Sequence, residues 1–240
     1  MPLVVFHLKD EEKSAVVERL LSESSPRQEF FLMVTLAVLM STLGLLISNV
    51  PVIIGSMLVA PLLSPILSFS LGIVLADVSV VLRSGFVILK SFAFSLLGAM
   101  IVAFFVGRGA FFSSEILSRA EPSFTFFFIA FLAGLAGSFS YTKSSVSALL
   151  PGVAISVSLI PPISVLGIGM ANLDQHLVNG SALLFLMNIV GIVFASMIVF
   201  SMSRLGVKRR KAVAVIKKED KEIAQEKREV VKKQEQERRS

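Results

Sequence analysis

Cysteine is absent from the 240 residues, and only 17% of them are charged. The absence of cysteine excludes disulfides, thiol catalysis and cysteine-based metal sites. The two histidines, His7 and His176, lie far apart in the sequence and outside the long apolar runs. The chain contains no HExxH, P-loop or GxSxG motif, and no pair of aspartates within an apolar run. We therefore expect no enzyme, no metal site and no cofactor.

Long apolar runs make up most of the chain. Hydrophobic residues account for 54% of the sequence, and the mean hydropathy is +0.81. Several runs lack charge over about 20 residues, which is the length that a helix needs to cross a hydrocarbon core of roughly 30 Å. The short alternating segments of a β-barrel are not visible. The composition predicts an all-α integral membrane protein.

A repeat organises the apolar part of the chain. Segment 55–77 reads GSMLVAPLLSPILSFSLGIVLAD, and a second copy 97 positions further on, at 152–174, reads GVAISVSLIPPISVLGIGMANLD. Laid over each other without a gap, the copies match at Gly55/Gly152, Leu62/Leu159, Pro65/Pro162, Ile66/Ile163, Gly72/Gly169 and Asp77/Asp174. Each copy also carries two prolines, which remove backbone donors and clash with the preceding turn. We expect the helix in each copy to be broken at its prolines.

The predicted fold has about six transmembrane helices, arranged as two three-helix repeats that each have a proline-broken middle helix. The expected divisions are a polar N-terminal segment with an amphipathic helix lying on the membrane surface (1–29), repeat 1 (30–106), an interfacial loop (107–123), repeat 2 (124–203) and a basic tail (204–240). Three crossings per repeat make the repeats inverted. Loops 49–51 and 171–180 contain no Lys or Arg, which predicts both termini in the cytoplasm. If the broken helices are re-entrant instead, each repeat crosses twice and the copies are parallel.

The paired breaks are the strongest indication of a site. Irregular backbone at membrane depth is tolerated only where protein covers it or a cavity meets it, and such breaks mark binding sites in transporters. The candidate ion or substrate pathway comprises Ser56, Ala60, Pro61, Ser64, Pro65, Ser68, Ser156, Ser158, Pro161, Pro162, Ser164 and Asn188. In this view Ser64 caps the second half-helix of the first copy. Asp77 and Asp174 either gate the pathway or cap the helices that follow them. The alternative is that the prolines only kink the helices and the serines only serve packing.

The basic excess of the chain lies in the tail. Residues 204–240 contain 14 Lys/Arg and 7 Asp/Glu, a net charge of +7. A basic segment directly after a membrane span contacts anionic lipid. The candidate lipid contacts are Lys208, Arg209, Arg210 and Lys211, and we expect no nucleic-acid partner.

Three ordered motifs resemble a known family. They read GSMLVAPLLSPILSFSLG, PGVAISVSLIPPISVLGIGM and LFLMNIVGIVFASMIVF, and they are similar to the bacterial and archaeal membrane proteins of domain-of-unknown-function family 389. The resemblance implies an integral protein of the inner membrane of a prokaryote, and it implies no particular activity. It also implies that the family's recurring positions here are Gly55, Ala60, Pro61, Pro65, Gly152, Pro161, Pro162, Gly167 and Asn188. Members often bear an additional soluble N-terminal region, which is at most short in this chain.

Two functions are compatible with these patterns. The first is a small transporter or channel-like protein for an ion or small solute, acting as a homo-oligomer, with its site between the two breaks. The second is a non-transporting membrane scaffold that recruits lipid or protein through its tail and N-terminal helix. A dry, fully packed centre between the breaks would favour the scaffold.

Overall fold

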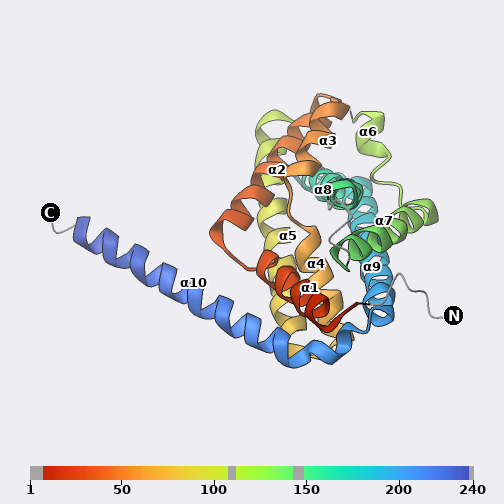
Figure 1. Cartoon of the computed structure of the whole chain (residues 1–240). Helices are drawn as coiled ribbons and strands as arrows, with labels where there is room; N and C mark the ends of the chain where they lie inside the picture. The colour runs from red at the N-terminus through yellow and green to blue at the C-terminus, as the bar shows by residue number, and fades with distance from the viewer. Residues whose placement is uncertain (1–7, 108–111, 143–148, 238–240) are drawn as a thin grey trace.

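The computed structural model describes residues 8–107, 112–142 and 149–237, with side chains described throughout except at 149–158, 227 and 230–237. Within these ranges every regular element is a helix (Figure 1). The helices are α1 (Asp10–Glu23), α2 (Gln28–Leu46), α3 (Val50–Val59), α4 (Leu63–Val74), α5 (Val78–Val106), α6 (Ser114–Leu117), α7 (Phe124–Thr142), α8 (Leu149–Asn172), α9 (Gln175–Met202), a 3-10 turn (Leu205–Lys208) and α10 (Arg209–Glu237).

Four helices, α2, α5, α7 and α9, are long and apolar enough to cross a membrane. The pair α3–α4 is a fifth candidate, with a bend of 51° between its halves. Large apolar side chains stand on the outer surface of α5 along its whole length, including Leu82, Phe86, Leu97 and Phe105, which are 58–79% exposed. An apolar surface of this extent is compatible with lipid and not with water. The helices indicate an integral membrane protein.

The break in the first copy lies between α3 and α4. Ala60 has an extended backbone, with φ −79° and ψ 117°, as expected for a residue that precedes proline. Pro65 is the third residue of α4, where the amide hydrogen that proline lacks would have had no partner within the helix. The two prolines are therefore spaced so that one ends a helix and the other is accommodated at the start of the next.

The predicted break in the second copy is wrong. Helix α8 runs without interruption through Pro161 and Pro162. These adjacent prolines leave no room for a non-helical segment between them, unlike Pro61 and Pro65. Every residue from 159 to 169 is buried, so tertiary packing holds the proline-containing turn in helical form.

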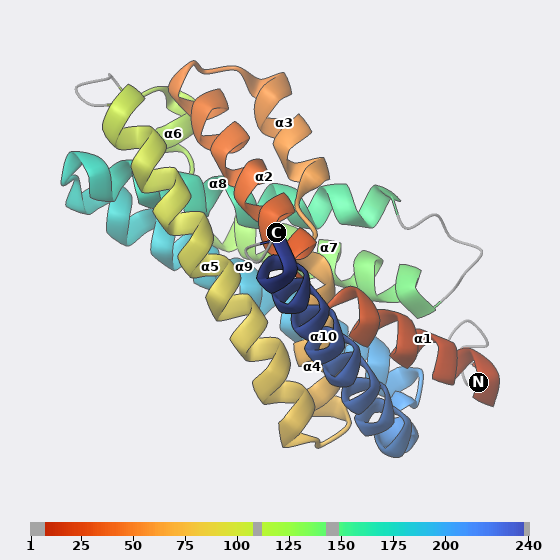
Figure 2. The ribbon, with the colours of Figure 1, turned by 90° about the vertical axis from the view of Figure 1, so that its left-hand side faces the viewer.

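Two contacts show which ends of the long helices lie close together. The C-terminal part of α5 lines a pocket together with Ala171, three residues before Asp174, whereas the N-terminal end of α5 lies near the end of α9, where Arg209 pairs with Asp77. Helix α2 begins close to Glu23, and α7 ends there, because Tyr141 bonds to Glu23. Figure 2 shows α2 and α5 side by side along the bundle, in agreement with their direct packing.

The terminal helices α1 and α10 pack on one end of the bundle and on each other. Val17, Leu20 and Leu21 of α1 are at most 1% exposed, so the apolar face of this helix is buried against protein. The expectation that α1 lies on the membrane surface is therefore wrong, because α4, α7 and α10 cover the face that would have entered lipid. Beyond these contacts α10 leaves the bundle and ends away from it (Figure 1).

Candidate functional site

A small apolar cavity of about 10 Å³ lies between the first break, α5, α8 and α9. Its lining, which we call the central cluster, consists of Leu62, Ile66, Ile88, Phe92, Leu159, Ile163, Phe185 and Ile189. These eight residues form four pairs separated by the repeat offset of 97 positions, namely 62/159, 66/163, 88/185 and 92/189. The rings of Phe92 and Phe185 stack with centroids 5.1 Å apart. Each repeat therefore contributes the same four positions to the centre.

The central cluster is dry. A buried water needs about 10–15 Å³ and two to four polar partners, and the lining of this cavity consists of side chains without polar groups. The segments beside the prolines thus meet through leucine and isoleucine. None of the predicted pathway residues lines this cavity.

The predicted pathway serines have other partners. Ser56 Oγ donates to the carbonyl of Ile53 at 2.6 Å, and Ser68 Oγ donates to the carbonyl of Leu20 at 2.9 Å. Ser164 is fully buried in α8, and its hydroxyl has no hydrogen-bond partner among the described residues. Ser156 and Ser158 belong to the part of α8 whose side chains lie outside the described residues. Of the four serines whose side chains are described, two thus satisfy backbone carbonyls rather than facing one shared space.

A cluster of polar side chains lies at the first break, and we call it the α1 mouth. It consists of Arg19, Glu23, Ser64 and Tyr141. Ser64 does not cap α4; its hydroxyl donates to Glu23 Oε2 at 3.1 Å and lies 3.0 Å from the hydroxyl of Tyr141. Tyr141 donates to the same carboxylate oxygen, and Arg19 Nε donates to Glu23 Oε1 at 2.8 Å. The Arg19 guanidinium also lies over the Tyr141 ring, 4.9 Å from its centroid. One carboxylate of α1 thereby joins α4 of the first repeat to α7 of the second.

Sequence reasoning missed Glu23, Arg19 and Tyr141. The contact between Glu23 and Tyr141 spans 118 positions, which no local pattern reports. Two weak signals were present: the i, i+4 spacing of Arg19 and Glu23, and the fact that Tyr141 is the single tyrosine of the chain.

A second polar group lies on the other side of the central cluster, at the prolines of α8. We call this pocket of about 260 Å³ the α6 mouth, and its lining is Glu115, Ser118, Arg119, Phe126, Ile129, Pro162, Leu184 and Asn188. Asn188 is 2% exposed. Arg119 Nη1 donates to the carbonyl of Glu115 at 2.6 Å and to its carboxylate at 2.8 Å. Two predicted pathway residues, Pro162 and Asn188, thus line this pocket together.

Asp77 and Asp174 occupy equivalent N-cap positions. Asp77 Oδ1 accepts from the backbone amides of Ser79 and Val80, and Asp174 Oδ1 accepts from that of Leu177. Asp77 has an additional partner, because Arg209 Nε donates to its Oδ2 at 2.9 Å. This bond lowers the pKa of the Asp77 carboxyl below its usual range against the opposing effect of burial. Both side chains begin the helices that follow them.

The predicted lipid contacts in the tail are largely engaged within the protein. Lys208 pairs with Asp10, and Lys211 Nζ lies 2.9 Å from Glu18 Oε2. With Arg209 on Asp77, three of the four cations have acidic partners, and Arg210 is exposed.

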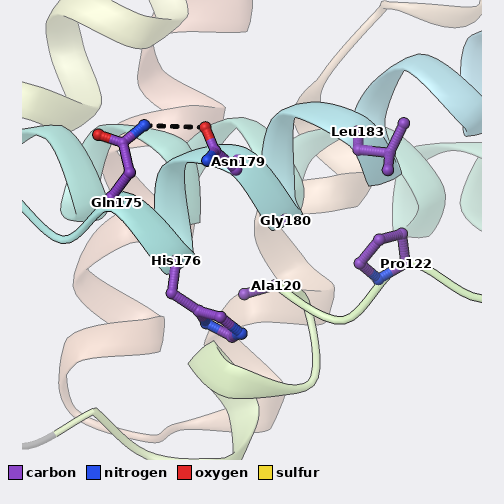
Figure 3. A pocket seen from close by; sticks show the side chains of 7 residues that line it. All are labelled: Ala120, Pro122, Gln175, His176, Asn179, Gly180 and Leu183. Atoms are coloured by element: carbon purple, nitrogen blue, oxygen red, sulfur yellow. Dashed lines mark hydrogen bonds between the residues drawn. The ribbon is translucent and has the colours of Figure 1, made fainter.

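A larger pocket of about 360 Å³ lies at the surface, over the first turns of α9 (Figure 3). His176 stands there without a second ligand-type side chain, and Gln175 Nε2 donates to Asn179 Oδ1 at 2.9 Å. No group of three His, Cys, Asp or Glu that could hold a metal occurs in the described part of the chain. A Cβ on Gly180 would stand 1.8 Å from the carbonyl oxygen of Ala120, so this region is a tight loop-on-helix contact. It offers no convergent donors to a ligand.

Comparisons with known proteins place this geometry in a family. A model described as Domain of unknown function (DUF389) matches residues 57–194, a range that contains the whole central cluster. An uncharacterized protein of Methanocaldococcus jannaschii is 31% identical over 205 residues, which are 81% of this chain and 63% of that protein. The chain thus spans less than two thirds of the length of this relative. No solved structure matches.

Proposed function

The chain belongs to the DUF389 family of domains of unknown function, and we propose that it is a transporter or channel-like protein for an ion or small solute. The observation that carries the proposal is the central cluster, in which four positions of one repeat meet the same four positions of the other. Polar mouths stand on the two sides of this cluster, at Ser64 and at Asn188.

The proposal includes two inverted repeats, formed by α2, α3–α4 and α5 and by α7, α8 and α9. Two features support the inversion: α5 and α9 run in opposite directions, and the paired residues surround one cavity as a two-fold axis requires. Inverted repeats with an interrupted helix near the membrane centre are typical of secondary transporters. With three crossings each, both termini lie on one side, which we propose is the cytoplasm.

The dry centre is interpreted as a closed gate. Apolar constrictions stop conduction because water and ions leave them, and they conduct once they widen or become polar. The proposed path leads from the α1 mouth past Leu62 and Leu159 to the α6 mouth, and the central cluster closes it. The described conformation is then the non-conducting one.

Two further parts of the proposal concern the surroundings of the protein. Arg210 is exposed at the start of α10 and is available to anionic lipid, unlike its paired neighbours. A bundle with so few crossings is proposed to function as a homo-oligomer in the inner membrane of a prokaryote.

The test is to make the gate polar. Leu62→Ser and Leu159→Ser are purified and reconstituted in liposomes, and the fluxes of potassium, chloride and glycerol are measured separately. We expect both variants to raise the flux of at least one probe about tenfold over the unmodified protein, which corresponds to about 1.4 kcal/mol of barrier. Because the two positions are equivalent, the increases should be similar.

The matched control is Leu67→Ser, which introduces the same polar group at a buried position of α4 outside the central cluster. It should lower stability without raising flux. Liposomes that contain folded Leu62→Ser or Leu159→Ser and conduct no more than those with Leu67→Ser would refute the proposal.

The scaffold is the second candidate, and two observations favour it. The cavity within the central cluster is apolar and almost filled, and α10 extends away from the bundle, where it can meet a partner (Figure 1). Deletion of residues 208–240 should then abolish the cellular function, while gate substitutions should act only through stability.

A further inference from the structure

We infer that α1 is a lid over the α1 mouth, held closed by ion pairs with α10. Its effect on conduction depends on the proposed function, whereas the opening of the lid can be measured without any transport. The lid is defined as residues 10–23, and the segment 24–27 connects it to α2.

The underside of the lid covers the serines of the first break. Leu20 is fully buried, and its carbonyl accepts the hydroxyl of Ser68 at 2.9 Å. Glu23, at the end of the lid, accepts from Ser64 and Tyr141. Ser64 and Ser68 are less than 7% exposed, and polar groups of α1 accept their hydrogen bonds. Removing α1 would therefore uncover a polar surface directly beside the break.

The two repeats differ in the helix that covers the proline-containing segment, and this difference points to a separate function for α1. Over Pro162 the covering element is α6, a single turn of four residues, and a pocket of about 260 Å³ remains. Over the first break the covering element is α1, with 14 residues, which bonds to Ser64 and Ser68 through Glu23 and Leu20. One mouth is thus open in this conformation and the other is covered.

The ion pairs that hold the lid join it to the start of α10. Lys208 pairs with Asp10 at the beginning of α1, and Lys211 pairs with Glu18 at 2.9 Å. Arg27, just after the lid, lies 3.3 Å from Glu219 and 3.1 Å from Glu222 of α10. Each of these pairs has at least one partly exposed partner, and pairs of this kind are individually weak and are screened by salt. The ion pairs add to the hold of the buried apolar face of α1, so a change in the tail or in ionic strength shifts the balance between the closed and the open lid.

The absence of cysteine makes a direct measurement possible. Ser68→Cys places a single thiol under the lid, and its rate of reaction with a membrane-impermeant maleimide reports lid opening. The double reversal Asp10→Lys with Glu18→Lys turns both pairs into repulsions and should accelerate labelling about tenfold. Adding Lys208→Asp with Lys211→Glu restores opposite charges and should return labelling to the slow rate.

Two controls complete the measurement. Ala15→Cys, on the exposed side of α1, should react at the same rate in every background. In the unreversed protein, raising the salt to about 1 M, where the Debye length is about 3 Å, should also accelerate labelling of Ser68→Cys. Labelling that ignores the reversal, or that the compensating pair does not slow, would overturn the lid.

Flux measured on the same reversals separates the lid from the proposed function. Faster labelling together with higher flux in the Leu62→Ser background supports both. Faster labelling with unchanged flux supports the lid and counts against a conduction path through the α1 mouth. Unchanged labelling overturns the lid whatever the flux.

Discussion

The contact between α5 of the first repeat and α8 of the second is closest at Gly167. A Cβ added there would stand 2.4 Å from the Cβ of Ala99 and 3.0 Å from the backbone of Ala99 and Met100. Carbon atoms pack at about 3.5–4.0 Å, so Gly167→Ala requires the two helices to separate by roughly 1 Å. Gly55, in α3, is the matched control because nothing lies within 4 Å of its added Cβ.

The expected magnitude follows from two terms. Replacing glycine by alanine within a helix stabilises it by roughly 0.5–1 kcal/mol, and this gain applies to both positions. Overpacking at a close contact costs about 1–3 kcal/mol, and this cost applies only to Gly167→Ala. The helix-propensity gain cancels in the comparison, so Gly167→Ala should be about 1–3 kcal/mol less stable than Gly55→Ala.

Thermal unfolding of both variants in detergent measures this difference. For a chain of 150–250 residues 1 kcal/mol changes Tm by about 2–4 °C, so the two Tm values should differ by roughly 2–12 °C. Gly55→Ala should equal or exceed the unmodified protein. Equal Tm values for the two variants would show that α5 and α8 are not in this close contact, and the central cluster described above would not form.

Two further predictions concern the polar contacts. Asp77→Asn keeps the N-cap but loses the charge that pairs with exposed Arg209, so it should cost about 0.5–1 kcal/mol at pH 7, whereas Asp174→Asn should cost almost nothing. The pKa of Asp77 is lowered in the folded state, so the ion pair stabilises the fold above the unfolded pKa of about 3.9, and this stabilisation is lost as pH falls through the folded pKa. The Tm values of wild type and Asp77→Asn should therefore converge at low pH. A difference in Tm that stays constant with pH contradicts the reasoning. Tyr141→Phe removes the hydroxyl that donates to Glu23 and should cost about 1 kcal/mol, seen as a lower Tm, and an unchanged Tm would show that the bond adds nothing.

The elements that sequence determines locally were predicted well. Charge-free runs predict α2 and α7 because an apolar run long enough to cross a membrane must satisfy its backbone within a helix. Pro61 predicts the first break because the residue before it avoids helical geometry. The prediction of a second break failed because the backbone conformation at Pro161 and Pro162 depends on the side chains packed around α8. The conformational preference of the prolines themselves contains no information about that packing.

The candidate site was harder to predict for a related reason. A serine in an apolar helix can bond to a carbonyl of its own helix, as Ser56 does, or reach a distant group, as Ser64 does. Both serines look alike in the sequence. The choice depends on which helix lies opposite, and the partners of Ser64 come from α1 and α7, 41 and 77 positions away. Pairing across such distances is a property of the fold.

Comparing the two repeats at the offset of 97 positions shows which residue types they share and which they do not. The four central pairs are apolar in both copies, whereas the polar positions beside them differ: Ser64 is replaced by Pro161, and Ser91 by Asn188. A contact that served packing alone would constrain both sets to a similar degree. On the proposed function the difference has a reason, because one gate must close identically from both repeats while each mouth faces a different side of the membrane. The unlike covers α1 and α6 belong to the same asymmetry.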